Sequence, residues 1–300
     1  MASTADWVAL EPDIETVFAH DEDPLQALAD ARIPGVVLRG AYNPDHCTGL
    51  IRRFIERGMM RNPENPDPDL EANYQFAGGP GSNSRIDIGT SIVNRTRGGQ
   101  RISDNDAENR EDFLQHSAAT HELFSYLFDG FDNPVDALYD SLSGLAVDKE
   151  VKVAREPDGR LYGPAVFRIH YTGHGYAPHI NHVSIVDKLF NFDITRFRHQ
   201  FAGLICIQNA TDGDRCPHAI IDQCVWSPEV QEHLSNGTYF QYMTERKIPR
   251  YQIEVNPGDF YLFNSGCIHQ VAHVEGKTPR TVLATFIGYS EDDDEIFVWA

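Results

Sequence analysis

The second half of the chain is a series of short apolar segments, and this pattern restricts the fold more than any other feature. The segments are rich in β-branched and aromatic residues and are separated by Gly, Asn, Asp and Pro. The expected strands are 166–171, 203–208, 219–225, 251–254, 260–263, 271–274 and 281–289. A helix is expected at 184–197. Short strands at this spacing predict an antiparallel barrel or jelly roll.

The first half has a different pattern. Apolar residues at helical spacing predict helices at 24–31, 45–60, 111–128 and 133–142, and a strand is expected at 33–38. Residues 61–112 are polar with little periodicity, and a loop of this length inside a domain is usually either functional or mobile. We therefore expect an α+β protein. Residues 1–150 would form a mainly helical support that includes the polar loop, packed on the same core as a β region at 151–300.

The charge of the chain limits its partners. With 45 acidic against 25 basic residues, the formal net charge is −20. A surface of this sign repels phosphate backbones and anionic lipid, so we expect no nucleic acid and no membrane as partners. The first residues lack the basic and apolar segments of a secretion signal. Five cysteines without a CxxC pair favour free thiols in a reducing cytoplasm.

Two histidines and an arginine stand out by their context. His179 follows the expected strand 166–171, and His269 comes 90 residues later. Arg280 follows His269 by eleven residues and opens the last long strand. Two imidazoles can occupy two coordination positions of Fe(II), and an arginine can form a bidentate pair with a carboxylate of a 2-oxo acid. The spacing suits a mononuclear iron site in a jelly roll. The competing interpretation is two structural histidines and a surface salt bridge.

Further segments accompany these three residues, and together they resemble a known family. They are residues 141–145, 165–168, 203–226, the turn 258–259 and residues 286–289. From about Asp140 onward the chain resembles the Fe(II)- and 2-oxoglutarate-dependent oxygenases, which fold as a double-stranded β-helix. Within them it is most similar to the carrier-protein-independent aliphatic halogenases of hapalindole- and welwitindolinone-type biosynthesis. The residues before this stretch contribute little to the resemblance.

The resemblance implies an enzyme with two cofactors. It would bind Fe(II), 2-oxoglutarate and dioxygen, and oxidise an unactivated C–H bond of a small molecule in specialised metabolism. His179, His269 and position 181 would face the metal, and Arg280 would hold the far carboxylate of 2-oxoglutarate. Arg168 and His170 share one face of the expected strand 166–171 and are candidate contacts of cofactor or substrate. The sequence does not say which face of that strand lines the interior.

Position 181 departs from the family pattern. The hydroxylases have His-x-Asp or His-x-Glu, and the halogenases have His-x-Gly or His-x-Ala, which leaves a coordination position for chloride. The segment His179-Ile180-Asn181 matches neither. The Asn181 amide can bind iron through its oxygen, swing aside for water or chloride, or form only a local turn bond. Alternatively His182 or Asp187 supplies the ligand, or Asn181 is an engineered change from Asp.

Three functions follow from these alternatives. Hydroxylation or a related oxidation is the first expectation, because Asn181 fills volume that a glycine or alanine would leave for chloride. Halogenation by the same fold is the second. A non-catalytic small-molecule-binding protein with a degraded metal site is the third. In the first two, the basic residues of the site predict an electropositive pocket inside an acidic exterior.

Overall fold

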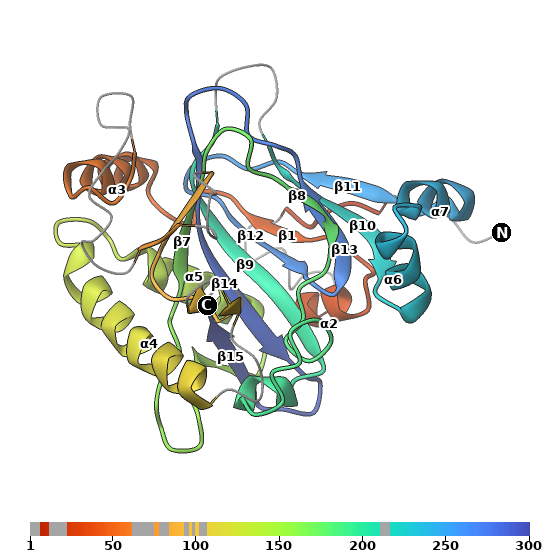
Figure 1. Ribbon diagram of the computed structural model, residues 1–300, viewed down its shortest axis with the longest axis horizontal. Helices are drawn as coiled ribbons and strands as arrows, with labels where there is room; N and C mark the ends of the chain where they lie inside the picture. Colours follow the sequence, from red (N-terminus) through yellow and green to blue (C-terminus); the bar gives the residue numbers. More distant parts are fainter. Residues whose placement is uncertain are drawn as a thin grey trace.

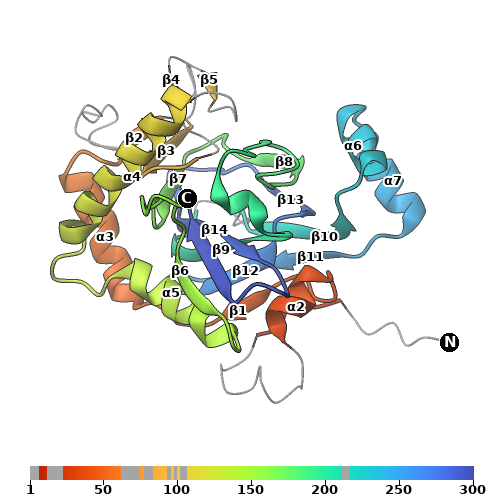
Figure 2. The same ribbon diagram turned by 90° about the horizontal axis from the view of Figure 1, so that it is seen from below.

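Two β-sheets face each other, and helices cover the outer side of the larger one (Figure 1). This is a computed structural model, and it describes residues 7–11, 23–61, 75–77, 84–92, 96–97, 100–101, 107–210 and 217–300. Seen from below, α3, α4 and α5 lie on one side of the molecule and α6 and α7 on the other (Figure 2). Their bounds are α3 Pro44–Glu56, α4 Ala107–Leu127, α5 Pro134–Leu145, α6 Pro228–Ser235 and α7 Tyr239–Arg246.

The larger sheet contains the longest strands. Within the described ranges its order is β1 (Val36–Leu38), β12 (Phe260–Asn264), β9 (His199–Gln208), β14 (Arg280–Tyr289), β7 (Val166–His170), β3 (Arg85–Ile88) and β2 (Gln75–Ala77). Strand β14 pairs along its length with β9, and on its other side it pairs first with β7 and then with β15 (Glu295–Trp299). Strand β15 in turn pairs in parallel with β6 (Glu150–Val153).

The smaller sheet carries the two histidines. Its order is β11 (Arg250–Ile253), β10 (Ala219–Val225), β13 (Cys267–Val271) and β8 (Tyr176–His179). A separate pair joins β4 (Thr96–Arg97) to β5 (Gln100–Arg101). The chain passes from the larger sheet to the smaller one at Ser265-Gly266, because β12 pairs with β9 whereas β13 pairs with β10 and β8. The side chain of Asn264 accepts a hydrogen bond from the Gly266 amide and so closes this turn.

Three helices begin with the same local chemistry. Asp23 before α2 (Pro24–Ala29), Asn43 before α3 and Asn133 before α5 each accept a hydrogen bond from a backbone amide of the first turn. Each is followed by proline, which lacks an amide hydrogen and has the backbone angle that a first helical turn requires. These pairs therefore fix where the supporting helices start.

Strand β7 shows how the sheet separates its core from its pocket. Phe167 and Ile169 point outward into the apolar cluster formed with α3, α4 and α5. Phe167 is fully buried there against the rings of Phe54 and Phe124. Arg168 and His170 point the other way and line a cavity between the sheets. The alternation of a strand therefore places these two basic residues inside.

The structure confirms most expected elements. The expected helices correspond to α2, α3, α4 and α5, and six of the seven expected strands correspond to β7, β9, β10, β11, β12 and β14. Strands β1 and β3, from before residue 150, pair with β12 and β7. The domain boundary at residue 150 stays a prediction. Most of the polar stretch 61–112 lies outside the described residues, but β3 forms within it.

Two expectations were wrong. Residues 184–197 form turns and the short 3-10 helix η2 (Asp193–Arg196), and Lys188 has a positive φ of 54° that a helix does not allow. Their apolar residues are spaced to fill the core beside Phe113, with Leu189 and Phe192 fully enclosed. The strand expected at 271–274 instead runs from Cys267 to Val271, so His269 lies within it.

No helix in the described parts of the chain is both long and apolar enough to cross a membrane.

Candidate active site

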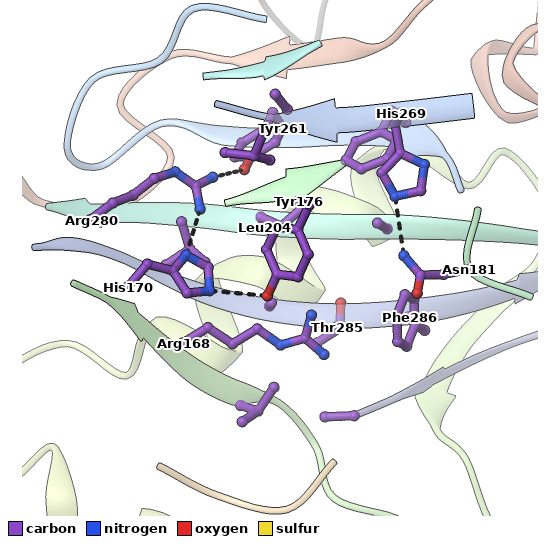
Figure 3. Close-up of a pocket in the computed structure, with 18 of the residues that line it drawn as sticks. Arg168, His170, Tyr176, Asn181, Leu204, Tyr261, His269, Arg280, Thr285 and Phe286 are labelled. Atoms are coloured by element: carbon purple, nitrogen blue, oxygen red, sulfur yellow. Dashed lines mark hydrogen bonds between the residues drawn. The ribbon is translucent and has the colours of Figure 1, made fainter. Parts of the chain in front are cut away.

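A cavity of about 110 Å³ lies between the two sheets (Figure 3). Its lining includes six of the residues that the sequence singled out, namely Arg168, His170, His179, Asn181, His269 and Arg280. They come from β7, β8, β13 and β14, and from the segment directly after β8. The fold therefore brings together residues up to about a hundred positions apart, as the sequence predicted.

His179 and His269 are direct neighbours across the β8–β13 pair. Their ring centroids are 4.3 Å apart. Nδ1 of His179 lies 2.8 Å from the carbonyl oxygen of Ala177, and Nδ1 of His269 lies 2.9 Å from that of Cys267. Because a carbonyl only accepts, each ring carries its proton on Nδ1 and keeps a lone pair on Nε2.

Burial reinforces this neutral state of the two rings. It lowers the pKa of His179, and it lowers the pKa of His269 well below its ordinary value, where the neighbouring His179 adds to the effect. Neutral imidazoles with a hydrogen bond on the far nitrogen are the form in which histidine binds a metal. The two rings thus present metal-binding nitrogens toward a common point.

Asn181 is the third group at this point. Its amide nitrogen lies 3.2 Å from Nε2 of His179 and 3.1 Å from Nε2 of His269. The main chain of residue 181 is held by separate contacts. Its backbone N–H donates to the carbonyl oxygen of Ser265, and its backbone carbonyl oxygen accepts a hydrogen bond from the Ser265 hydroxyl. That hydroxyl also contacts the carbonyl of Gln200, at the start of β9. Asn181 is therefore fixed by its main chain and turns its amide to the histidine pair.

The other candidate ligands lie elsewhere. Nδ1 of His182 accepts a hydrogen bond from the Ser184 amide, and its Nε2 contacts the carbonyl of Arg198. Asp187 does not line the cavity. No group of three His, Cys, Asp or Glu side chains suited to a metal occurs among the residues that the structure describes. Asn181 is consequently the side chain that accompanies the two imidazoles.

Arg280 forms a second centre in the same cavity. Its guanidinium is buried, donates to the hydroxyl of Tyr261 at 2.8 Å and contacts Nδ1 of His170 at 3.3 Å. Since an arginine only donates, His170 accepts on Nδ1 and carries its proton on Nε2, 3.2 Å from the Tyr176 hydroxyl. Burial, and next the charge of Arg280, hold the pKa of His170 well below its ordinary value. His170 is thus a neutral group that positions Arg280.

Sequence reasoning missed an ion pair beside this centre. Arg85 and Asp87 of β3 are both buried and paired with each other, and Arg85 also donates to the Tyr176 hydroxyl at 3.1 Å. The signal was present in Arg85-Ile86-Asp87-Ile88, where polar and apolar residues alternate with the period of a strand. It was overlooked because it lies in the polar stretch 61–112.

The residues present fit an iron site and a carboxylate site. Two converging Nε2 atoms, each oriented by a carbonyl on its own strand, are a suitable donor pair for a divalent transition metal. The Asn181 amide nitrogen lies within hydrogen-bond distance of both lone pairs. Rotation of this amide would turn its oxygen to the same point. At Arg280, a buried guanidinium flanked by a hydroxyl is suited to a carboxylate.

The family model described as the carrier-protein-independent halogenase WelO5 matches residues 5–300. The chain belongs to this family. The match to the WelO5 family spans the supporting helices as well as both sheets, whereas the resemblance in the sequence began only near Asp140. No curated protein sequence matches the chain.

Two solved structures are similar to the chain. An N-substituted L-amino acid dioxygenase from Burkholderia ambifaria has a TM-score of 0.50 and 15% identity, over 72% of this chain and 86% of that one. HygX from Streptomyces hygroscopicus, with nickel and 2-oxoglutarate bound, has a TM-score of 0.47 and 12% identity, over 94% of this chain and 89% of that one. The first of these confirms the expected fold class, an α+β protein built on a double-stranded β-helix.

Proposed function

We propose that the protein is an Fe(II)- and 2-oxoglutarate-dependent oxygenase that hydroxylates an unactivated C–H bond of a small molecule. The observation that carries the proposal is the pairing of two centres in one cavity: the converging Nε2 atoms of His179 and His269, and the buried guanidinium of Arg280. Membership of the WelO5 family supports it. A role in specialised metabolism and a cytoplasmic location belong to the same proposal.

In this proposal His179 and His269 hold the metal, with Asn181 at the third position. The carbonyl oxygens of Ala177 and Cys267 keep both rings in the binding tautomer. When bound, iron and 2-oxoglutarate supply the activation of dioxygen, which no side chain provides. The chain itself orients the groups and encloses them between two sheets.

Arg280 holds the far carboxylate of 2-oxoglutarate in the same proposal. Tyr261 and His170 fix the orientation of the guanidinium from two sides. Because His170 is neutral, it adds no positive charge that would compete with Arg280 for the carboxylate. A fixed guanidinium binds a carboxylate more strongly than a mobile one, since less side-chain entropy is lost.

Halogenation is the second candidate, and two observations favour it. The chain matches the WelO5 halogenase family, and in the described part of the chain no carboxylate lines the cavity beside the two histidines. A metal held by two neutral imidazoles and an amide keeps its full positive charge and attracts an anion such as chloride. Against this, the Asn181 amide occupies the place where such an anion would bind.

Anaerobic reconstitution tests the proposal. The protein is loaded with Fe(II) and 2-oxoglutarate, then exposed to oxygen with a panel of small molecules, with and without chloride. Metal content, succinate and product mass are measured. We expect bound iron, succinate and a product heavier by one oxygen atom. A chlorinated product made only with chloride present would replace hydroxylation by halogenation.

Two variants control this experiment. His269→Ala removes one Nε2 and should abolish iron binding. His233→Ala removes a half-buried histidine of α6, outside the cavity, whose ring contacts Thr238, so the variant should bind iron like the wild type. If neither the wild type nor the His233 variant retains iron or forms succinate, the protein is a binding protein rather than an oxygenase.

A further inference from the structure

Within the described part of the chain, three arginines line the cavity, and the proposed reaction uses neither Arg85 nor Arg168. Arg168 and His170 lie on the same face of β7, and in the pairing with β14 His170 stands opposite Arg280 and Arg168 opposite Val282. Arg168 is therefore one two-residue step, about 7 Å, further along the sheet. Figure 3 shows its guanidinium directed away from Arg280, toward Phe286 and the end of the cavity where Asn181 lies.

Arg168 has no carboxylate of its own among the side chains that the structure describes there, although Asp87 stands opposite it in the β3–β7 pair and attracts it, and the Tyr176 hydroxyl also interacts with it. The carboxylate of Asp87 is engaged by Arg85. Arg168 Nη2 lies 3.4 Å from the hydroxyl of Ser91, which is a long contact, and its Nε is enclosed with no hydrogen-bond partner. Burial, and next the charge of Arg85, lower the pKa of Arg168.

An enclosed guanidinium without a carboxylate is costly, because the lost hydration is not replaced. The cost is removed when a ligand brings the carboxylate, and a guanidinium matches that group with two parallel hydrogen bonds. Arg168 therefore has the properties of a ligand anchor rather than of a structural ion pair. Arg85, in the same lining, shows the structural alternative, since the fold provides Asp87 for it.

The surroundings of Arg168 indicate what the rest of the ligand is. The Phe286 ring lies 5.7 Å from the central carbon of the guanidinium. Val166, Leu204, Val282 and Ala284 also line the cavity and are apolar, whereas Tyr176 and Thr285 add hydroxyl groups there. A ligand that fits this part of the cavity has an apolar body and a single carboxylate.

We propose that Arg168 binds the carboxylate of the substrate, so that the substrate class is a small organic acid with an apolar body. This inference rests on the proposed function, in which Arg280 is reserved for 2-oxoglutarate. It places the acid group of the substrate at one wall and leaves its apolar part between Phe286 and the histidine pair. The acidic exterior of the protein does not oppose this, because the lining itself carries arginines and no acidic side chain.

Matched pairs of ligands test the inference without a known substrate. Protein loaded with Ni(II) and saturating 2-oxoglutarate is titrated with a panel of aromatic and aliphatic monocarboxylates and with the corresponding primary amides, in chloride-free buffer. We expect at least one acid to bind about tenfold or more tightly than its amide. If no acid in the panel is preferred over its amide, the inference is wrong.

Variants then assign the preference to one residue. Arg168→Gln should remove the preference for the acid, and Arg168→Lys should retain part of it, because the positive charge remains. Arg246→Gln, at an exposed arginine of α7, should leave it unchanged. An acid preference that survives in a folded Arg168→Gln protein would also contradict the inference.

Three further results separate this inference from the proposed function. If Arg168→Gln weakens 2-oxoglutarate binding as much as Arg280→Gln does, Arg168 belongs to the cosubstrate site and only the present inference fails. If sodium chloride displaces the bound acid at equal concentration, the anchor binds inorganic anions and the inference fails as well. If the wild type binds neither Ni(II) nor 2-oxoglutarate, the proposed function itself fails.

Discussion

The amide nitrogen of Asn181 lies 3.1 Å from Nε2 of His269, on the side where the lone pair of that ring points. It lies at almost the same distance from Nε2 of His179. A neutral amide thus stands at the position where the hydroxylases of the superfamily carry an acidic residue. In the proposed metal site, this side chain is the third group beside the two imidazoles.

Changing Asn181→Asp should strengthen metal binding at least about tenfold, because a carboxylate adds an anionic ligand beside two neutral imidazoles. Fe(II) or Ni(II) affinity measured by calorimetry checks this. Asn181→Ala, which removes the third group without adding charge, is the matched comparison and should not strengthen binding. Equal affinity of the wild type and the Asp variant would place residue 181 outside the coordination of the metal.

Changing Arg280→Gln should weaken 2-oxoglutarate binding by roughly 10- to 100-fold, because a charge-assisted bidentate pair is lost. Tyr261→Phe should weaken it only a few-fold, since that hydroxyl orients the guanidinium through one hydrogen bond. Calorimetric titration of the metal-loaded protein measures both. Metal affinity should stay constant in the two variants, and a parallel loss of metal would indicate misfolding instead.

The stability of the protein should fall when the pH drops below neutrality. Burial, and next the charge of Arg85, lower the pKa of His174 to about 4, whereas the unfolded chain binds this proton near the ordinary value of 6.5. The contribution of His174 is therefore complete above about pH 6.5 and is lost as the pH falls toward 4. Because the ring is only partly buried, we expect about 1–2 kcal/mol from it.

Urea unfolding at pH 7 and pH 4.5 measures this pH dependence. Between pH 7 and pH 4.5, the variant His174→Gln should lose about 1–2 kcal/mol less unfolding free energy than the wild type. The same change at His233 of α6 is the matched comparison and should leave the difference between the two pH values unaltered. Identical pH dependence of wild type and His174→Gln would show that His174 is not held neutral by the fold.

Truncating Phe167→Ala should cost about 3–5 kcal/mol of unfolding free energy, because a fully buried ring between β7 and the helices is removed. Chemical denaturation checks it. Phe240→Ala, at a ring of α7 that is 50% exposed, should change stability by no more than about 0.5 kcal/mol. A small effect at Phe167 would mean that packing of the helices against β7 adds little to the free energy of unfolding.

The sequence allowed the fold class to be predicted, whereas the roles of the site residues stay predictions. Period-two strands marked most of the sheets, and the spacing of His179, His269 and Arg280 placed them in one cavity, which the structure confirms. The orientation of β7 was not predictable. Both of its faces carry large side chains, and only the helices packed on Phe167 and Ile169 decide which face is outside.

The missed elements have a common physical origin. Residues 184–197 show helical spacing because their apolar side chains fill a core around Phe113, although Lys188 and the extended Phe192 prevent a helix. The Arg85–Asp87 pair depends on β3 adding to the edge of β7, which is a contact between segments about 80 residues apart. Single-sequence patterns report local periodicity and do not contain such long-range pairings.

The double attachment of residue 181 has a consequence for how this site can be altered. Ser265, in the turn between the two sheets, holds the main chain of residue 181 through its carbonyl oxygen and its hydroxyl, and the same hydroxyl contacts the Gln200 carbonyl of β9; none of these contacts involves the Asn181 side chain. An exchange of this side chain should therefore leave the surrounding fold intact. Under the proposed function, the ligands of the metal can then be changed at this position without a loss of folding.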